Sequence, residues 1–274
     1  MSLVITWRDR KELMQALPSF VELIEALQGE IIIVNFGGSP GFLREQLNGC
    51  SNERIKVVDV KDQHYFNKSC AQNIGAYHSS YPVLFFCDCD IILDQKLVGE
   101  LVENIMQQEN LFATIAHVKE TVPCASNNNH ILLMGYTLTL KKKDGRTLQL
   151  VYRGEDAETG LRMAPGLLLT RRAHFLTVQG YNSQFSGWGW EAQDIISRLV
   201  LGAGLERRDK GIALHISHDE ESRTKFSSVT DRWENRDRMF RQAIANYYAG
   251  NFYGTYFSDI AMPAALTTLH KTSA

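Results

Sequence analysis

Two carboxylates separated by one residue, Asp88 and Asp90, are the most chemically suggestive residues of this 274-residue chain. They end an apolar run that begins at Val83, and apolar residues follow at 91–93. Alternate residues of a strand project from the same face, so the two acids would lie side by side if the strand continued through them. Adjacent carboxylates repel unless a cation lies beside them, and their oxygens suit Mg²⁺ or Mn²⁺, which could hold a diphosphate. The pattern also fits a strand end that turns into solvent with two hydrated acids.

A second stretch that could do chemistry is the turn 187–194, in which glycines flank Trp188. Glu191 and Asp194 are three residues apart and would share a face at the start of a helix expected over 191–201. This arrangement fits an aromatic platform for a sugar ring with a carboxylate beside it. It equally fits a helix start that carries acids, which the helix dipole favours.

A third candidate is the pair of histidines His215 and His218, in a segment, 211–219, that begins as an apolar strand. Imidazole nitrogens bind transition metals, and the two histidines are three positions apart in the chain. A histidine in such a segment is more often a hydrogen-bonded polar residue than a metal ligand. Both interpretations stay open on these residues alone.

The elements that would position these residues alternate between strands and helices. Apolar runs predict strands, and helical spacing predicts helices between them; the strands are 3–6, 30–36, 54–60, 83–93 and 111–116, and the helices include 13–27 and 67–77. The alternation is typical of βαβ units with right-handed crossovers and a parallel sheet. Ligands of such sheets bind beyond the carboxyl ends of the strands, where Arg8, Arg10 and the acidic pair fall.

The rest of the chain gives weaker signals. The segments 131–140 and 147–152 predict a hairpin, and the charged segment 153–162 is a candidate for a mobile loop. A strand is expected near 165–170, and a long helix over 229–248. These elements would complete one large α/β domain.

Composition excludes several classes of protein. A hydrophobic content of 44% supplies a large core, and a net charge of −2 gives no broad attraction to nucleic acid or an acidic membrane. The five cysteines are an odd number without zinc-type spacing, which favours a reducing compartment. No apolar run approaches the ~20 residues that span a bilayer, and no signal peptide opens the chain. We therefore expect a cytoplasmic protein with no nucleic-acid partner and no transmembrane segment.

Three separated stretches resemble the GT-A glycosyltransferases, specifically the β-1,4-galactosyltransferases and the related bacterial chondroitin-polymerase modules. They are residues 5–13 (ITWRDRKEL), residues 66–90 with FNKSCAQNIG and FCDCD, and residues 165–204 with the GWGWE turn. The resemblance covers most of residues 3–218. It implies a GT-A (Rossmann-like) α/β fold, with a mostly parallel central sheet flanked by helices.

The resemblance also implies a division of the chain. A glycosyltransferase domain would occupy residues 1–218, with a nucleotide-binding part at 1–116 and an acceptor and metal part at 117–218. Residues 219–274 would form a C-terminal helical extension packed on the same domain.

Site residues follow from the same resemblance. Asp90 would be the direct Mn²⁺ (or Mg²⁺) ligand, Asp88 would lie by the ribose and the metal, and His215, with His218 as the alternative, would be the distant ligand. The loop 153–162 would close over donor and metal. Residues expected to line the sugar nucleotide are Thr6, Trp7, Arg8, Arg10, Phe66, Lys68, Asp88, Cys89, Gly166 and Trp188.

One departure from the resembled family concerns the catalytic base. In the galactosyltransferases an aspartate that follows the glutamate of the turn deprotonates the acceptor, and this chain has Ala192 there. Glu191 and Asp194 are the carboxylates in reach on the same helix and are the candidate catalytic residues. The retaining polypeptide N-acetylgalactosaminyltransferases also carry a neutral residue at this place. We favour inversion, and retention stays an alternative.

The function that the resemblance implies is transfer of a hexose or N-acetylhexosamine from a UDP-sugar to a carbohydrate or glycolipid acceptor, in bacterial capsule or lipopolysaccharide synthesis. Association with a membrane surface or with a complex would fit such a role. A non-catalytic carbohydrate- or nucleotide-sugar-binding protein is one alternative, favoured by Ala192. A sugar nucleotidyltransferase is another, because it would share the early sheet and the acidic metal site.

Overall fold

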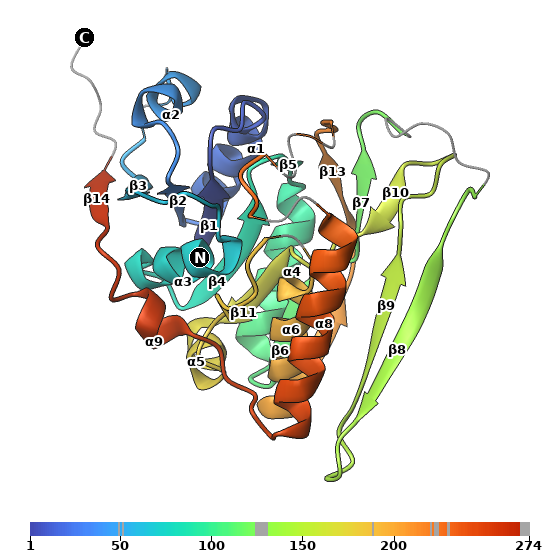
Figure 1. Cartoon of the computed structure of the whole chain (residues 1–274). Helices are drawn as coiled ribbons and strands as arrows, with labels where there is room; N and C mark the ends of the chain where they lie inside the picture. Colours follow the sequence, from blue (N-terminus) through green and yellow to red (C-terminus); the bar gives the residue numbers. More distant parts are fainter. Residues whose placement is uncertain are drawn as a thin grey trace.

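A mixed eight-stranded sheet forms the centre of the computed structural model (Figure 1), which describes all residues except 49, 51, 124–130, 188, 220, 222–224, 229–230 and 269–274. Its order is β12-β6-β11-β4-β1-β2-β3-β14. The neighbours β4, β1, β2 and β3 run parallel, as do β12 and β6, whereas β11 and β14 run antiparallel to theirs. The strands are β1 (Ser2–Trp7), β2 (Glu30–Phe36), β3 (Ile55–Val60), β4 (Val83–Asp88), β6 (Leu111–Thr114), β11 (Leu168–Arg171), β12 (Glu206–Asp209) and β14 (Ala265–Thr268). The expected mostly parallel α/β sheet is confirmed.

The central strand β4 shows why the sequence builds a sheet that is covered on both faces. Phe85 and Cys87 belong to one apolar core, whereas Leu84 and Phe86 belong to another on the opposite face. All four side chains are buried. A continuous apolar run therefore marks this strand, in place of the alternation seen in half-exposed strands.

Helices cover both faces. The core that contains Phe85 takes in the apolar stripes of α1 and α4, and the opposite face is covered by α3, α5, α6 and α8. A π-helix over Arg198–Gly202 continues α6, so the helix expected over 191–201 changes its hydrogen-bonding pattern halfway. The helices are α1 (Leu13–Ala26), α2 (Pro40–Gln46), α3 (Lys68–His78), α4 (Gln95–Gln107), α5 (Arg172–Thr177), α6 (Glu191–Ser197), α8 (Arg232–Tyr248) and α9 (Tyr256–Asp259).

Between the two acids of the motif, the chain leaves the large sheet and turns toward a second, four-stranded sheet. Its order is β10-β7-β13-β5, with β5 (Ile91–Ile92), β7 (His117–Glu120), β10 (Leu161–Met163) and β13 (Ile212–His215). Strand β4 of the large sheet ends at Asp88, and Asp90 lies in the turn that leads into β5. The strand does not continue through both acids, so they do not lie side by side on one strand.

The predicted hairpin is present as β8 (Gly135–Lys141) and β9 (Thr147–Arg153). Figure 1 shows it on the opposite side of the molecule from β14. Leu148 and Leu150 on one face of β9 join the core beneath α6 and α8. The segment expected as a mobile loop begins as the end of β9 and ends in β10, with a hydrogen-bonded turn at Asp156–Gly160 between them.

The C-terminal part shares the core and the sheet of the rest of the chain. Met239 and Ala243 of α8 lie in the same core as Phe86, and β14 adds an antiparallel strand beside β3. The sequence analysis did not predict β14, because this stretch is thin in apolar residues. The domain boundary at residue 218 stays a prediction. Among the helices of the described residues, none combines the length and the apolar character needed to cross a membrane.

Candidate functional site

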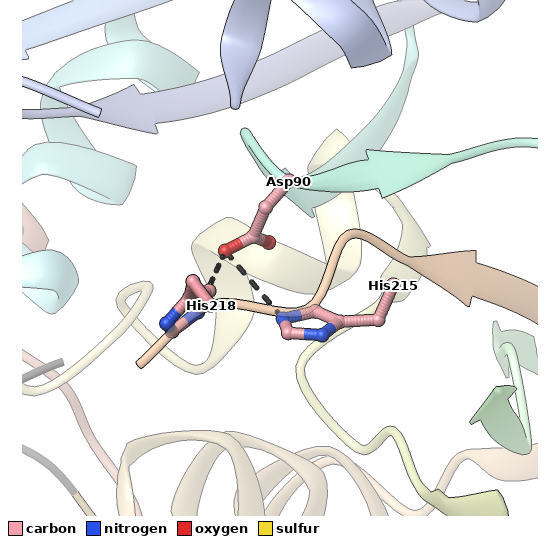
Figure 2. Close-up of side chains that lie close together, drawn as sticks. All are labelled: Asp90, His215 and His218. Atoms are coloured by element: carbon pink, nitrogen blue, oxygen red, sulfur yellow. Dashed lines mark ion pairs between the residues drawn. The ribbon is translucent and has the colours of Figure 1, made fainter. Parts of the chain in front are cut away.

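Asp90, His215 and His218 come together in one cluster (Figure 2). The Oδ2 atom of Asp90 lies 3.5 Å from Nε2 of His215 and 3.4 Å from Nε2 of His218. One potential ligand atom of each residue lies within 4.8 Å of the other two. Figure 2 shows the carboxylate facing both rings, which come from the end of β13 and the segment after it. The structure brings both histidines to Asp90, so the cluster offers two imidazole ligands instead of one.

Strand pairing holds this cluster in place. His215 of β13 lies opposite Ile91 of β5, the residue that follows Asp90. The N–H of Ile216 donates a hydrogen bond to the carbonyl of Asp90 at 2.8 Å. Two segments that are far apart in the sequence are thus fixed backbone to backbone at the point where their side chains meet.

Glu120 orients His215, and the sequence analysis missed it. In the pairing of β7 with β13, Glu120 lies opposite His215, and its Oε2 atom is 2.7 Å from Nδ1 of that ring. The same carboxylate accepts hydrogen bonds from Arg162 and Ser217. When Nδ1–H donates to Glu120, Nε2 keeps its lone pair for a metal ion. No local pattern marks Glu120, because only the register of two strands assigns it to the site.

The donor set fits a divalent cation. The Oδ1 atom of Asp90 is buried and has no hydrogen-bond partner within the described residues, a costly state unless a ligand satisfies it. Burial alone would raise the pKa of Asp90, but hydrogen bonds from His215 and His218 hold it well below its usual range. Two imidazoles beside a carboxylate suit a transition-metal ion better than Mg²⁺, which prefers oxygen ligands.

Asp88 lies outside this cluster. It is opposite Thr6 where the parallel strands β1 and β4 end, and its carboxylate forms an ion pair with Lys68. Burial alone would lower the pKa of Lys68, but the charge of Asp88 raises that pKa above its usual value, so Lys68 is positively charged. Asp88 is paired with Lys68 and is not among the clustered ligand atoms of the described chain, so its expected place by the ribose and the metal stays a prediction.

A cavity of about 230 Å³ contains the cluster and most of the residues expected to bind the nucleotide. Within the described residues, Arg8 has two buried guanidinium nitrogens, Nε and Nη1, without a partner, and its guanidinium carbon lies 4.3 Å from the ring centroid of Phe226. Arg10 differs, because it donates to Asp90 and Glu12 at 3.0 and 2.9 Å. Arg8 is thus the better candidate to bind phosphate. The expected nucleotide residues that line the cavity are Thr6, Arg8, Arg10, Phe66, Lys68, Asp88 and Cys89.

Trp7 does not line this cavity, contrary to expectation. Its side chain is fully buried, its ring packs near Phe42, and its indole N–H donates to the carbonyl of Arg10 at 2.8 Å. Neighbouring residues of a strand point to opposite faces, so Trp7 lies in the core when Thr6 faces the cavity. Its contribution is to hold the backbone that carries Arg10.

A larger cavity of about 590 Å³ adjoins the first, and Gly166 and Ala192 line it as well. Glu191 lies at the boundary of the two, where its Oε2 atom accepts a hydrogen bond from the N–H of Gly189 at 3.0 Å. Burial raises the pKa of Glu191, and Lys68 partly opposes that rise. A carboxylate with a raised pKa suits proton transfer nearer neutral pH. The residues common to both cavities are Lys68, Asp88, Arg162, Glu191 and His218.

Asp194 is a correction to the expected site. The structure does not bring it to either cavity, because its buried carboxylate accepts hydrogen bonds from Arg198 at 2.7 Å and from the hydroxyl of Tyr247 at 2.9 Å. Glu191, at the first position of α6, turns back to Gly189 and the cavity, whereas Asp194 is bound one turn onward by Arg198. The two acids therefore do not act on one face.

Trp188, expected as a sugar platform, lies outside the described residues. The glycines beside it line the cavities, Gly187 the smaller and Gly189 the larger, and they also let α8 pack closely against the turn. A Cβ on Gly189 would lie 2.6 Å from the Cα of Arg236, and one on Gly187 would lie 2.5 Å from the side chain of Asn235. This turn is thus shaped by helix packing.

Solved structures with similar folds are glycosyltransferases. GalNAc-T7 with UDP, GalNAc and Mn²⁺ superimposes with a TM-score of 0.61 and 16% identity, covering 96% of this chain and 51% of that one. A mannosyltransferase, PcManGT from Pyrobaculum calidifontis, with GDP-Man and Mn²⁺, gives a TM-score of 0.56 and 10% identity, covering 94% and 67%. S. aureus TarS 1-349 with UDP-GlcNAc gives 0.57 and 11%, covering 89% and 65%.

These likenesses confirm the GT-A fold, and this chain spans about half the length of the GalNAc-T7 structure. The narrower resemblance to β-1,4-galactosyltransferases and chondroitin polymerases stays a prediction. A comparison with curated proteins found no match. A family model described as glycosyltransferase like family 2 matches residues 4–205. Since this match covers well over half of the sequence, the chain belongs to the glycosyltransferase-like family 2.

Proposed function

We propose that this protein transfers a hexose or N-acetylhexosamine from a UDP-sugar to a carbohydrate acceptor, with Mn²⁺ as cofactor. The observation that carries the proposal is the meeting of Asp90, His215 and His218 in a cavity that Arg8 also lines. The solved relatives that hold UDP or GDP-Man with Mn²⁺ support the same class of donor and ion. A cytoplasmic setting, which rests on the composition, and a place in surface-polysaccharide synthesis, which rests on the sequence resemblance, belong to this proposal.

Binding and positioning of the donor fall to residues at the strand ends. An ion held by Asp90, His215 and His218 would supply Lewis-acid stabilisation of the departing diphosphate. Arg8 offers its two unpartnered N–H groups to phosphate oxygens in charge-assisted hydrogen bonds. Lys68 brings a positive charge to the boundary of the two cavities, next to Asp88.

Glu191 is the proposed base. It lies where the two cavities meet, so an acceptor hydroxyl in the larger cavity would face a donor sugar in the smaller one. The carboxylate takes the hydroxyl proton as the sugar passes through an oxocarbenium-like state. A base on the acceptor side favours inversion. Ala192 lines the same cavity but cannot accept a proton, which leaves this role to its neighbour.

Calorimetry with UDP tests the metal site directly. We expect the wild-type protein to bind UDP in the presence of Mn²⁺ and to lose most of that affinity in excess EDTA. Asp90→Ala removes the central ligand and is expected to abolish both Mn²⁺-dependent UDP binding and turnover. Asp237→Ala, at an exposed carboxylate on α8, is the matched control and should bind as the wild type does. Unchanged Mn²⁺–UDP affinity in Asp90→Ala would overturn the proposal.

The released product distinguishes the proposed enzyme from its alternatives. Incubation with a panel of UDP-sugars and candidate acceptors should release UDP. Pyrophosphate release from a nucleoside triphosphate would instead indicate a nucleotidyltransferase. Metal-dependent UDP binding without release from any donor would indicate a binding protein that has lost catalysis.

A further inference from the structure

One part of the lining of the larger cavity is apolar. Six aliphatic residues, between 39% and 65% exposed, line it in three segments: the segment after β7, the one that leads into the hairpin, and the outer part of β9. We call this surface the apolar wall. Its members are Val122, Ile131, Leu132, Leu133, Met134 and Val151.

Exposure of this kind needs an explanation. Single exposed aliphatic side chains are common on protein surfaces, but a group of six along one cavity is the pattern of a binding surface. The other face of the hairpin, with Leu148 and Leu150, is buried in the core, so the fold already uses its apolar residues there. The exposed apolar residues on the cavity side therefore have no structural partner within the described chain that would bury them.

The apolar wall is continuous with the reaction site. The same cavity of about 590 Å³ is lined by Glu191, Lys68 and Asp88. The diphosphate would occupy the smaller cavity with Asp90 and Arg8, so the larger one is left for the acceptor. An acceptor whose hydroxyl reaches Glu191 would extend its next group along the apolar wall.

The chemistry of the wall favours an alkyl chain over a second sugar ring. Sugar rings need polar partners for their hydroxyls and stack on aromatic faces, and the wall offers aliphatic side chains only. Among the described residues, the aromatic side chains Tyr152 and Trp233 line this cavity, and both are already engaged, because the guanidinium carbon of Arg236 lies 5.5 and 4.5 Å from their ring centroids. An alkyl chain would bury its surface and that of the wall together.

We propose that the acceptor is a glycolipid, with its sugar hydroxyl at Glu191 and its alkyl chain on the apolar wall. The proposal rests on the proposed function and narrows its acceptor class. An apolar peptide or a second copy of this chain are the competing occupants, and binding measurements with matched acceptors separate them.

Matched acceptor pairs test the proposal. The methyl and n-octyl glycosides of glucose, galactose, N-acetylglucosamine and N-acetylgalactosamine are titrated into the protein below the micellar concentration, with and without UDP and Mn²⁺. We expect at least one octyl glycoside to bind about tenfold or more tightly than its methyl partner, because the chain adds several buried CH₂ groups. Leu132→Ser and Met134→Ser should each reduce that preference severalfold. Met106→Ser, a methionine of equal exposure on α4 outside the cavity, should keep it.

The possible outcomes separate the glycolipid proposal from the proposed function. Equal binding of methyl and octyl partners for all four sugars, in protein that binds UDP with Mn²⁺, would overturn the glycolipid proposal and leave the proposed function intact. Failure of the wild-type protein to bind UDP with Mn²⁺ would overturn the proposed function. The titrations without nucleotide would still measure how tightly the octyl glycosides bind the apolar wall. An octyl preference that survives both wall variants would place the alkyl chain elsewhere and overturn the proposal. Sedimentation that shows a dimer dissociated by Leu132→Ser would identify a second copy as the occupant, and the glycolipid proposal would then be wrong.

Discussion

The two cavities of this protein are built in opposite ways. Around the smaller one, polar side chains such as Asp90 and His215 are buried and bound to one another, and they project from strand ends and the turns beside them. Around the larger one, half-exposed aliphatic side chains lie outside the main sheet, with Leu132 and Met134 in the segment that leads into the hairpin and Val151 on β9. The lining of the smaller cavity is thus held by the core, whereas much of the lining of the larger cavity lies outside the main sheet.

If the two cavities bind donor and acceptor as proposed, the difference indicates how the protein separates these two binding tasks. Nucleotide and metal chemistry demands charged groups held in fixed geometry, which buried strand pairing provides. Acceptors vary among enzymes of one fold, and a peripheral hairpin can change without disturbing the sheet. Helix α6 connects the cavities to the core, because Glu191 lies at the boundary of the two cavities and Asp194 is buried in the core.

The largest predicted effect concerns Asp194, whose side chain should stabilise the core and take no part in binding at either cavity. Asp194→Asn removes the charge that pairs with buried Arg198 and should cost about 3–5 kcal/mol in the free energy of unfolding. Urea denaturation measures this loss. Affinity for UDP with Mn²⁺ should stay unchanged where the variant is folded. A fully stable variant with lost turnover would instead make Asp194 the base.

The next effect concerns Glu191 at the boundary. Glu191→Gln keeps the shape of the side chain but cannot accept a proton, so turnover should fall by about 10²-fold or more while donor affinity barely changes. Steady-state kinetics with a UDP-sugar and calorimetry with UDP measure the two quantities. Parallel losses in both would show that Glu191 belongs to the donor side and is not the base.

Much of the smaller cavity could be predicted from the sequence. The apolar run 83–87 identifies a doubly buried strand, and the carboxyl ends of parallel strands must meet, which places Thr6 and Arg8 near Asp88. The orientation of Trp7 and the position of Asp90 could not be predicted, because they depend on which face each strand residue takes and on where the chain changes sheets. Trp7 points to the core because its neighbour faces the cavity, and Asp90 separates from Asp88 because the chain changes sheets between them.

Residues that act through long-range pairing could not be predicted from local sequence. Glu120 becomes part of the site only when β7 lies beside β13. The apolar wall is another case, because its exposed aliphatic residues have the same sequence signature as a buried strand. Asp194 was expected at the site because helical spacing places it beside Glu191. Local sequence does not reveal that its carboxylate pairs with Arg198 in the core.

A smaller effect concerns the support beneath the metal cluster. Glu120→Gln keeps a hydrogen-bond acceptor for His215 but removes the negative charge that holds its Nδ1–H, so affinity for Mn²⁺ should fall by about 10- to 100-fold. Calorimetry with Mn²⁺ and UDP measures the loss. Unchanged Mn²⁺ affinity would show that His215 is oriented without Glu120.

The smallest predicted effect is a shift in pH dependence that ties the two cavities together through Lys68. If Glu191 is the base, turnover at saturating donor falls as the pH drops through its pKa, which burial raises and Lys68 partly lowers. Lys68→Gln removes that cation, so the pKa of Glu191 should rise further and the acidic limb of the profile should move to higher pH. Lys56→Gln, at a lysine paired with Glu30 outside both cavities, should leave the limb where it is. A limb that stays in place in Lys68→Gln would separate the base from the cation and thereby break the link between the donor and acceptor sides.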